Sequence, residues 1–272
     1  MKSLEVILLL ELQNLHKTFS KGTVNENYLF RGIDLKIEKG DFITIIGSNG
    51  AGKSTLLNII GGKIPLDSGK ILLNGNDISN VPEYKRCKVI GRVFQDPSLG
   101  TSPSMTILQN LSMAYNKGKS FNLTPGITKS KTNYFRTLLE KLNLGLENKI
   151  NTKVGDLSGG QRQSLALLMA TMSNPDVLLL DEHTAALDPK TSELILSLSE
   201  EVIREKNMTS LMVTHNLNHA IKTGNRLIML HRGQIIMDIK GEEKKDLTVE
   251  KLIDSFEKLN FKNELSDRAI FS

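Results

Sequence analysis

The segment from Gly47 to Thr55, GSNGAGKST, limits the fold of this chain more than any other segment. It follows a short β-rich apolar run at residues 42–46 and opens a stretch at 53–60 whose leucines and isoleucines recur at helical spacing. The glycines allow a turn whose N–H groups point inward, and the positive end of the following helix faces the same point. This order of strand, loop and helix predicts a phosphate-binding loop.

The side chains of the loop predict a nucleotide site. Lys53 can reach the β and γ phosphates, and Ser54 can bind Mg²⁺. Ordinary residue frequencies give a chance match in roughly one chain in a hundred of this size, and the flanking strand and helix lower that figure. The expected phosphate ligands are Gly47, Ser48, Asn49, Gly50, Ala51, Gly52, Lys53, Ser54 and Thr55.

Strands and helices alternate again in the second half of the chain, and this pattern favours an α/β fold with a parallel sheet covered by helices. Before the loop, three β-rich stretches predict a smaller antiparallel layer, the last of them entering a tight turn at Asn74 and Gly75. The expected strands are 12–19, 29–37, 71–73, 177–180, 211–214 and 226–230, and the expected late helices are 190–206 and 216–223.

A mostly helical stretch, about 97–157, interrupts the nucleotide-binding core, with helices expected at 105–115 and 131–142. Beyond about residue 240 the chain is charged and short, with one helix expected at 249–259. We therefore expect one nucleotide-binding domain over residues 1–240, with the helical subdomain inserted in it, and a C-terminal tail over 241–272.

The composition is that of a globular domain, with 272 residues, 39% hydrophobic and 24% charged. The apolar run at residues 6–10 is far shorter than the roughly 20 residues that span a bilayer. The single cysteine, Cys87, cannot form an internal disulfide and predicts neither a metal site nor catalysis.

Basic residues gather between Asp96 and Glu140, a window without any acidic residue, at Lys117, Lys119, Lys129, Lys131 and Arg136. One interpretation is a solvated surface loop, and the other is a patch that faces lipid headgroups. Few aromatic residues are interleaved with these charges, so we expect no nucleic-acid partner.

Two later motifs narrow the class of protein. The pentapeptide from Leu157 to Gln161 reads LSGGQ, and an apolar run further on ends in Asp181 and Glu182. With the phosphate loop, this order and spacing resembles the ATP-binding cassette (ABC) ATPases over about residues 12–240. The resemblance implies a P-loop NTPase (RecA-like) core, ATP and Mg²⁺ as ligands, and ATP hydrolysis as the activity.

The acidic pair carries the predicted chemistry. Asp181 ends a strand, where its carboxylate can hold the Mg²⁺ shell together with Ser54, and Glu182 can orient and deprotonate the attacking water. By resemblance, His215 is the switch histidine that contacts the γ-phosphate, and Gln95 touches Mg²⁺ and the water. The resemblance thus implies Glu182, His215 and Gln95 as catalytic residues and Ser54, Gln95 and Asp181 as metal ligands.

The LSGGQ element implies a second cassette, because in this family it covers the nucleotide held by another copy. Ser158, Gly159, Gly160 and Gln161 would then meet the γ-phosphate across the dimer, with Asp188 reaching to the opposite site. Phe19 lies about where the family stacks an aromatic ring on adenine, with Tyr28 as the alternative. The sequence departs from the family pattern at His183, Ser164 and Met169. For His183 there are two interpretations, a structural substitution and a pH-sensitive contact near the site.

The resemblance implies a peripheral ATPase subunit on the cytoplasmic face of the membrane, paired with a second cassette and bound to separate permease subunits and a solute-binding protein. With the stretches GTVNEN and DEHTAALDP, the chain resembles a little-characterised prokaryotic importer branch, for which amino acids, aromatic ones included, are the candidate cargo. The alternative is a soluble ABC ATPase that acts on ribosomes or DNA. A GTP-binding switch would need an Asn-Lys-x-Asp motif, which the sequence lacks.

Overall fold

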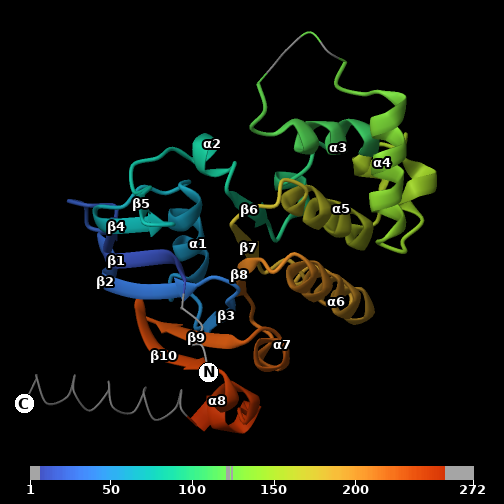
Figure 1. Cartoon of the computed structure of the whole chain (residues 1–272). Helices are drawn as coiled ribbons and strands as arrows, with labels where there is room; N and C mark the ends of the chain where they lie inside the picture. Colours follow the sequence, from blue (N-terminus) through green and yellow to red (C-terminus); the bar gives the residue numbers. More distant parts are fainter. Residues whose placement is uncertain (1–6, 121–122, 124, 255–272) are drawn as a thin grey trace, which may run out of the picture.

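The structure is a computed structural model, and it describes residues 7–120, 123 and 125–254. Two sheets stand beside a group of helices (Figure 1). The larger sheet has six strands in the order β10-β9-β3-β8-β7-β6. Its strands are β3 (Phe42–Gly47), β6 (Ile90–Val93), β7 (Val177–Asp181), β8 (Thr209–Val213), β9 (Arg226–His231) and β10 (Gln234–Lys240).

Strands β9, β3, β8, β7 and β6 are parallel neighbours, whereas β10 runs antiparallel to β9. The predicted α/β fold with a P-loop core is confirmed. Strands β6 and β10 were not predicted from the sequence. The run of β6 is short and interrupted by Gly91 and Arg92, and β10 is only partly buried.

The smaller sheet is antiparallel, with the order β2-β1-β4-β5. Its strands are β1 (Leu8–Phe19), β2 (Asn27–Glu38), β4 (Ser68–Leu73) and β5 (Asn76–Asp77). Helix α1 (Lys53–Gly61) lies between the two sheets, and its residues Leu56 and Leu57 join one apolar core with Phe30 of β2 and Ile45 of β3. This core fixes the start of α1, and therefore the phosphate loop, against both sheets.

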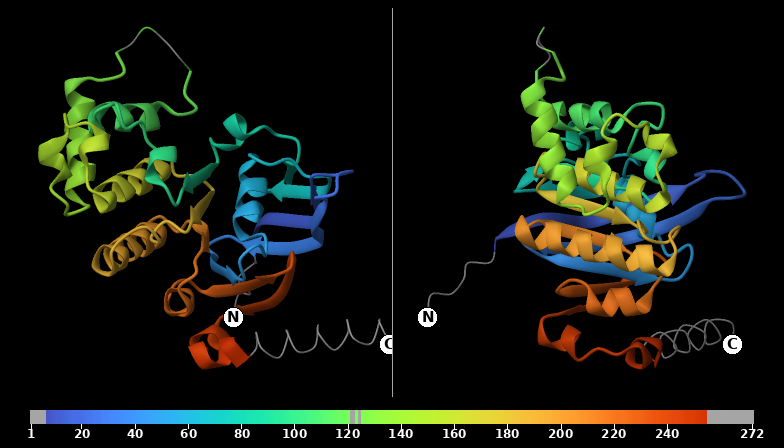
Figure 2. Two further views of the ribbon diagram at one scale, coloured as in Figure 1. Left: turned by 180° about the vertical axis from the view of Figure 1, so that it is seen from behind. Right: turned by 90° about the vertical axis from the view of Figure 1, so that its right-hand side faces the viewer.

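The helical region stands at one end of the molecule (Figure 2). It has its own apolar core, which includes Leu111, Phe135 and Leu165. The short helix α2 (Glu83–Arg86) precedes β6 in the chain. The elements of the helical region follow β6 and are η1 (Pro97–Leu99), α3 (Ile107–Asn116), α4 (Lys129–Glu140), η2 (Leu146–Lys149), η3 (Val154–Asp156) and α5 (Gly159–Thr171).

Part of the basic window is helical, because α4 begins at Lys129. Several of its charges have partners within the chain. The Nζ atoms of Lys119 and Lys131 lie 3.4 and 5.7 Å from the ring centroid of Tyr115, and Arg136 donates to the carbonyl of Glu147. These contacts favour the interpretation of this region as an ordinary solvated surface.

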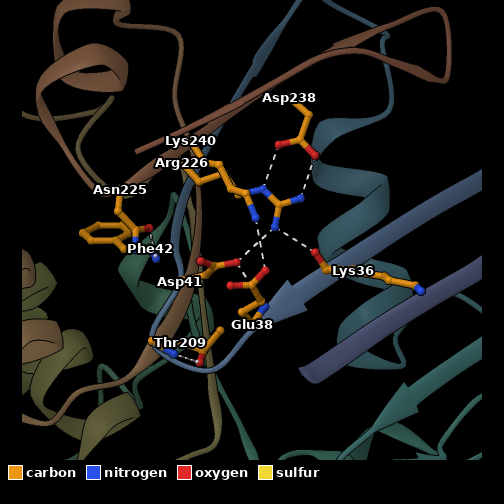
Figure 3. A network of polar contacts seen from close by, with 10 residues as sticks. Lys36, Glu38, Asp41, Phe42, Thr209, Asn225, Arg226, Asp238 and Lys240 are labelled. Carbon is orange, nitrogen blue, oxygen red and sulfur yellow. Dashed lines mark hydrogen bonds and ion pairs between the residues drawn. The ribbon is translucent and has the colours of Figure 1, made fainter. Parts of the chain in front are cut away.

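Helices α6 (Pro189–Glu205), α7 (Leu217–Lys222) and α8 (Glu242–Lys245) complete the fold. Arg226 is 6% exposed and ties the β9–β10 hairpin to the start of β3, because its guanidinium bonds to Asp238, Asp41 and the carbonyl of Lys36 (Figure 3). The Asp238 carboxylate raises the pKa of this guanidinium. The ion pair therefore remains charged and holds the hairpin in place.

The chain after α8 packs against the large sheet, where Leu252 joins Ile46 and Met229 in a small apolar cluster. The helix predicted at 249–259 is present over 249–254, and its remaining residues lie outside the described part. In the described ranges, no helix is both long enough and apolar enough to cross a membrane.

Candidate nucleotide site

The phosphate loop adopts the geometry that its glycines allow. Gly52 caps α1 with a φ of 101°. A Cβ built there would lie 2.6 Å from the ring of Phe30, so only glycine fits at position 52 beside this core side chain. The Nζ of Lys53 donates to the carbonyls of Gly47 at 2.8 Å and Ser48 at 3.0 Å. These hydrogen bonds hold the start of the loop against the side chain of Lys53.

Lys53 is 5% exposed, and burial lowers the pKa of its ammonium group, an effect opposed by the nearby carboxylates of Glu182 and Asp181. Phosphate oxygens at the loop would add further negative charge beside the ammonium group. They would therefore favour its protonated form.

Asp181 lies at the end of β7 with both carboxylate oxygens engaged. Ser54 Oγ donates to Oδ1 at 2.9 Å, and Arg92 Nη2 donates to Oδ2 at 3.0 Å. A hydroxyl and a carboxylate in contact are the hard oxygen ligands that Mg²⁺ prefers. The donors present here therefore fit Mg²⁺ at this point.

Glu182 follows with a φ of 48°, in the left-handed region that non-glycine residues rarely adopt. Its N–H donates to the carbonyl of Val213 at 3.1 Å, which ties it to the end of β8. Its Oε1 lies 2.6 Å from Nε2 of His215. The Glu182 side chain is 15% exposed and that of His215 is 47% exposed, so a largely buried carboxylate meets a half-exposed imidazole.

Lys53, Ser54, Glu182 and His215 line one cavity of about 340 Å³. Five residues predicted for this site are not among its lining residues: Gly47, Ser48, Ala51, Asp181 and Gln95, the last of which is exposed just beyond β6. The lining is Phe19, Asn27, Leu29, Asn49, Gly50, Gly52, Lys53, Ser54, Thr55, Glu182 and His215. Asn27 and Leu29 were not predicted, because nothing in a strand sequence shows which side chains meet a loop far away in the chain.

Phe19 borders this cavity, whereas Tyr28 is engaged elsewhere. The Tyr28 hydroxyl lies 2.5 Å from Nδ1 of His16, and the guanidinium of Arg31 lies 5.1 Å from its ring centroid. We expect Phe19→Ala to weaken ATP binding by about 1–3 kcal/mol, the range for a base stacked on an aromatic ring. Calorimetric titration measures this loss, and Tyr28→Ala is the matched control that should retain the affinity. Equal losses in the two variants would contradict the assignment.

The LSGGQ residues stand away from that cavity in the same chain, since none of them is among its lining residues. Ser158 is exposed and caps α5, where its Oγ accepts from the N–H of Gln161, while Gln161 Oε1 accepts from the N–H of Ser158. Gly160 lies so close to Thr191 that an added Cβ would be 2.4 Å from it. A side chain at position 160 would therefore collide with Thr191.

Asp188 caps α6 and is exposed beside this surface. Its carboxylate accepts from the N–H of Thr191 at 3.1 Å, and hydrogen bonds from the side chain and N–H of Thr191 lower its pKa. Asp188 and Ser158 thus cap two helices that meet where Gly160 contacts Thr191.

His183 is a structural residue. It is 2% exposed and its Nε2 lies 3.0 Å from Ser199 Oγ, whose own proton is donated to the carbonyl of Ile195. Ser199 therefore accepts from Nε2–H, and burial lowers the pKa of His183 to about 4. A neutral, enclosed imidazole excludes a pH-sensitive contact at physiological pH.

A phosphate loop at the end of a parallel strand, with a metal-binding carboxylate and a second carboxylate beside it, defines a P-loop nucleoside triphosphatase. The family model described as "ABC transporter" matches residues 30–185. A tyrosine transport ATP-binding protein of Clostridioides difficile (strain R20291) is 53% identical over 249 residues, which cover 92% of this chain and 99% of that protein.

A spermidine/putrescine import ATP-binding protein of Haemophilus influenzae is 35% identical over 85% of this chain, which spans 57% of that longer protein. Among solved structures, the dimeric post-hydrolysis state of an ATP-binding cassette bound to ADP and Pi is 31% identical. It has a TM-score of 0.71 and covers 85% of this chain and 98% of its own. The chain belongs to the ABC transporter family, and it is an ATPase that binds ATP.

Proposed function

We propose that this chain is the ATPase subunit of an importer, bound on the cytoplasmic face of the membrane to separate permease subunits, with an amino acid, tyrosine first, as its cargo. The observation that carries the proposal is the likeness to the tyrosine transport protein. The two sequences are 53% identical, and the match covers 99% of that protein. A solute-binding protein that delivers the amino acid belongs to the same proposal.

The proposed site needs two copies of the chain. Lys53 and the loop N–H groups bind the phosphates of one ATP, and Ser54 and Asp181 would hold its Mg²⁺, which would neutralise charge on the phosphates. Ser158 and the N-terminus of α5 come from the other copy, because they lie outside the cavity of their own chain. The solved cassette with ADP and Pi is dimeric, which supports this arrangement.

Within the closed pair, Glu182 orients the attacking water and accepts its proton, and His215 holds the Glu182 carboxylate and reaches toward the γ-phosphate. The 2.6 Å contact between these side chains supports their joint role. Gln95 lies in the chain between β6 and the helical region. A shift of the helical region would therefore change the distance between Gln95 and the phosphates. The loss of the γ-phosphate removes the group that attracts Ser158 and reopens the pair.

A second cavity, the docking groove, supports the permease contact. It has a volume of about 440 Å³ and lies where the core meets the helical region, with Arg92, Phe94 and Ala166 among its lining residues. Leu99 and Met113, both on its lining, are 64% and 47% exposed. Apolar side chains exposed around a groove are typical of a protein-binding site, and we assign this one to a cytoplasmic segment of the permease.

The test is uptake of labelled tyrosine by proteoliposomes that contain the permease and this chain. We expect uptake that requires ATP and falls at least roughly tenfold in a Leu99→Glu/Met113→Glu variant, because charges placed in an apolar interface lose their water. Val24→Glu, at a fully exposed apolar residue outside the groove, is the matched control. Binding to ribosomes or DNA, without binding to the permease, would contradict the proposal in favour of the soluble alternative.

A further inference from the structure

Arg92 lies between the nucleotide site and the docking groove. It is a cation within the short strand β6, and its side chain is 10% exposed. Its Nη2 bonds to Asp181 Oδ2 at 3.0 Å, its guanidinium carbon lies 4.5 Å from the ring centroid of Phe94, and it also lines the groove. One side chain therefore contacts a candidate metal ligand and the proposed docking site.

Two of the guanidinium donors are unused. Nε and Nη1 are buried and have no acceptor among the residues that the structure describes. Nη1 lies beside Gly61, which also lines the groove. A Cβ added to Gly61 would be 3.7 Å from Nη1. Buried N–H donors of a charged group are normally bonded, because they have lost water. Of the two, Nη1 lies beside the groove residue Gly61, and a turn of the guanidinium toward the groove would present it to an acceptor there.

The charge of the groove indicates which acceptor fits. Its described lining carries two cations, Arg92 and Lys117, and a single carboxylate, Glu83, while most of the other lining residues are apolar. A carboxylate matches the Arg92 guanidinium best, because it carries the opposite charge and its hydrogen bond to Nη1 is charge-assisted.

We propose that the Arg92 guanidinium is shared between Asp181 and an acidic side chain that the permease inserts into the groove. The inference rests on the proposed function, because the second carboxylate belongs to the permease. When that carboxylate accepts a hydrogen bond from Nη1, the guanidinium moves toward the groove and its bond to Asp181 weakens. Oδ2 of Asp181 then becomes available for the Mg²⁺ that accompanies ATP.

Docking and Mg·ATP binding therefore strengthen each other, since coupling between two binding sites is reciprocal. Phe94 supports this path, because its ring lies against the guanidinium and its carbonyl accepts from Gln163 of α5, the helix that begins with the LSGGQ residues. Arg92 acts through Asp181, and it is a positioning residue.

The experiment measures this coupling by calorimetry. The Kd of Mg·ATP is determined for the Glu182→Gln chain, alone and with the permease reconstituted in nanodiscs. We expect the permease to tighten Mg·ATP binding by about fivefold or more. Adding Arg92→Met should reduce that ratio to about 1, and should weaken docking by about tenfold or more through loss of charge-assisted hydrogen bonds.

Lys117→Met is the matched control, because Lys117 also lines the groove but makes no contact with Asp181 in the described structure. It should retain the coupling ratio. Arg92→Lys keeps the charge but has fewer hydrogen-bond donors, so it should give an intermediate coupling ratio. It also replaces Arg92→Met in the experiment if Arg92→Met does not fold.

An unchanged ratio in Arg92→Met, or an equal loss in Lys117→Met, would overturn the role of Arg92 while leaving the importer proposal in place. If the parent chain does not bind the permease at all, both proposals fail, so the two failures are distinguishable.

Discussion

Glu182→Gln is expected to lower ATP turnover by roughly 10² to 10⁴, the usual effect of removing a positioned general base. The amide keeps the size of the side chain and can still bond to His215, but it cannot accept a proton from water. ATP binding should persist, because the substitution leaves Lys53 and the loop, the proposed phosphate ligands, unchanged. Steady-state hydrolysis and ATP titration, measured on the same preparation, separate the two effects.

The chain contains a matched control for this variant. Glu193 also pairs with a histidine, His219, at 3.0 Å, but it is 70% exposed and does not line the phosphate cavity. Because exposed pairs contribute little, Glu193→Gln should keep turnover within about threefold. Near-normal hydrolysis by Glu182→Gln would remove Glu182 from the proposed chemistry.

Lys53→Ala is expected to weaken ATP binding by roughly 10- to 100-fold, the range for lost hydrogen bonds to a charged group. The substitution removes the cation proposed to bind the phosphates and leaves the carbonyls of Gly47 and Ser48 without their donor. Lys63→Ala, an exposed lysine just after α1, should bind ATP normally. Calorimetric titration measures both variants, and normal affinity in Lys53→Ala would contradict the role of the loop.

Local sequence was sufficient to predict the parts of the site that one short segment builds. The phosphate loop is such a segment, since its glycines, its lysine and the helix start lie within nine residues from Gly47 to Thr55. The same holds for the end of β7, where an apolar strand places Asp181 and Glu182 at the edge of a parallel sheet.

Contacts between distant segments could not be predicted in this way. Arg92 appeared as a polar interruption of an apolar run, and its pairing with Asp181 depends on β6 and β7 being neighbours in the sheet. The sequence alone does not decide the role of His183, because only tertiary burial beside Ser199 shows that it is neutral and structural. A cation within a short buried strand is the signal that could have marked Arg92 for attention.

A nucleotide site built from two copies of the chain can be tested by mixing two inactive variants. Lys53→Ala disables the phosphate loop of its own chain, and Ser158→Arg blocks the surface that covers the partner's nucleotide. A mixed dimer then contains one site with both defects and one intact site. Equilibrium binding should show that the mixture recovers about one tightly bound Mg·ATP per dimer, although neither variant does so alone. A mixture that binds no better than its separate components, or a wild-type chain that holds ATP in a hydrolytically active monomer, would contradict the account.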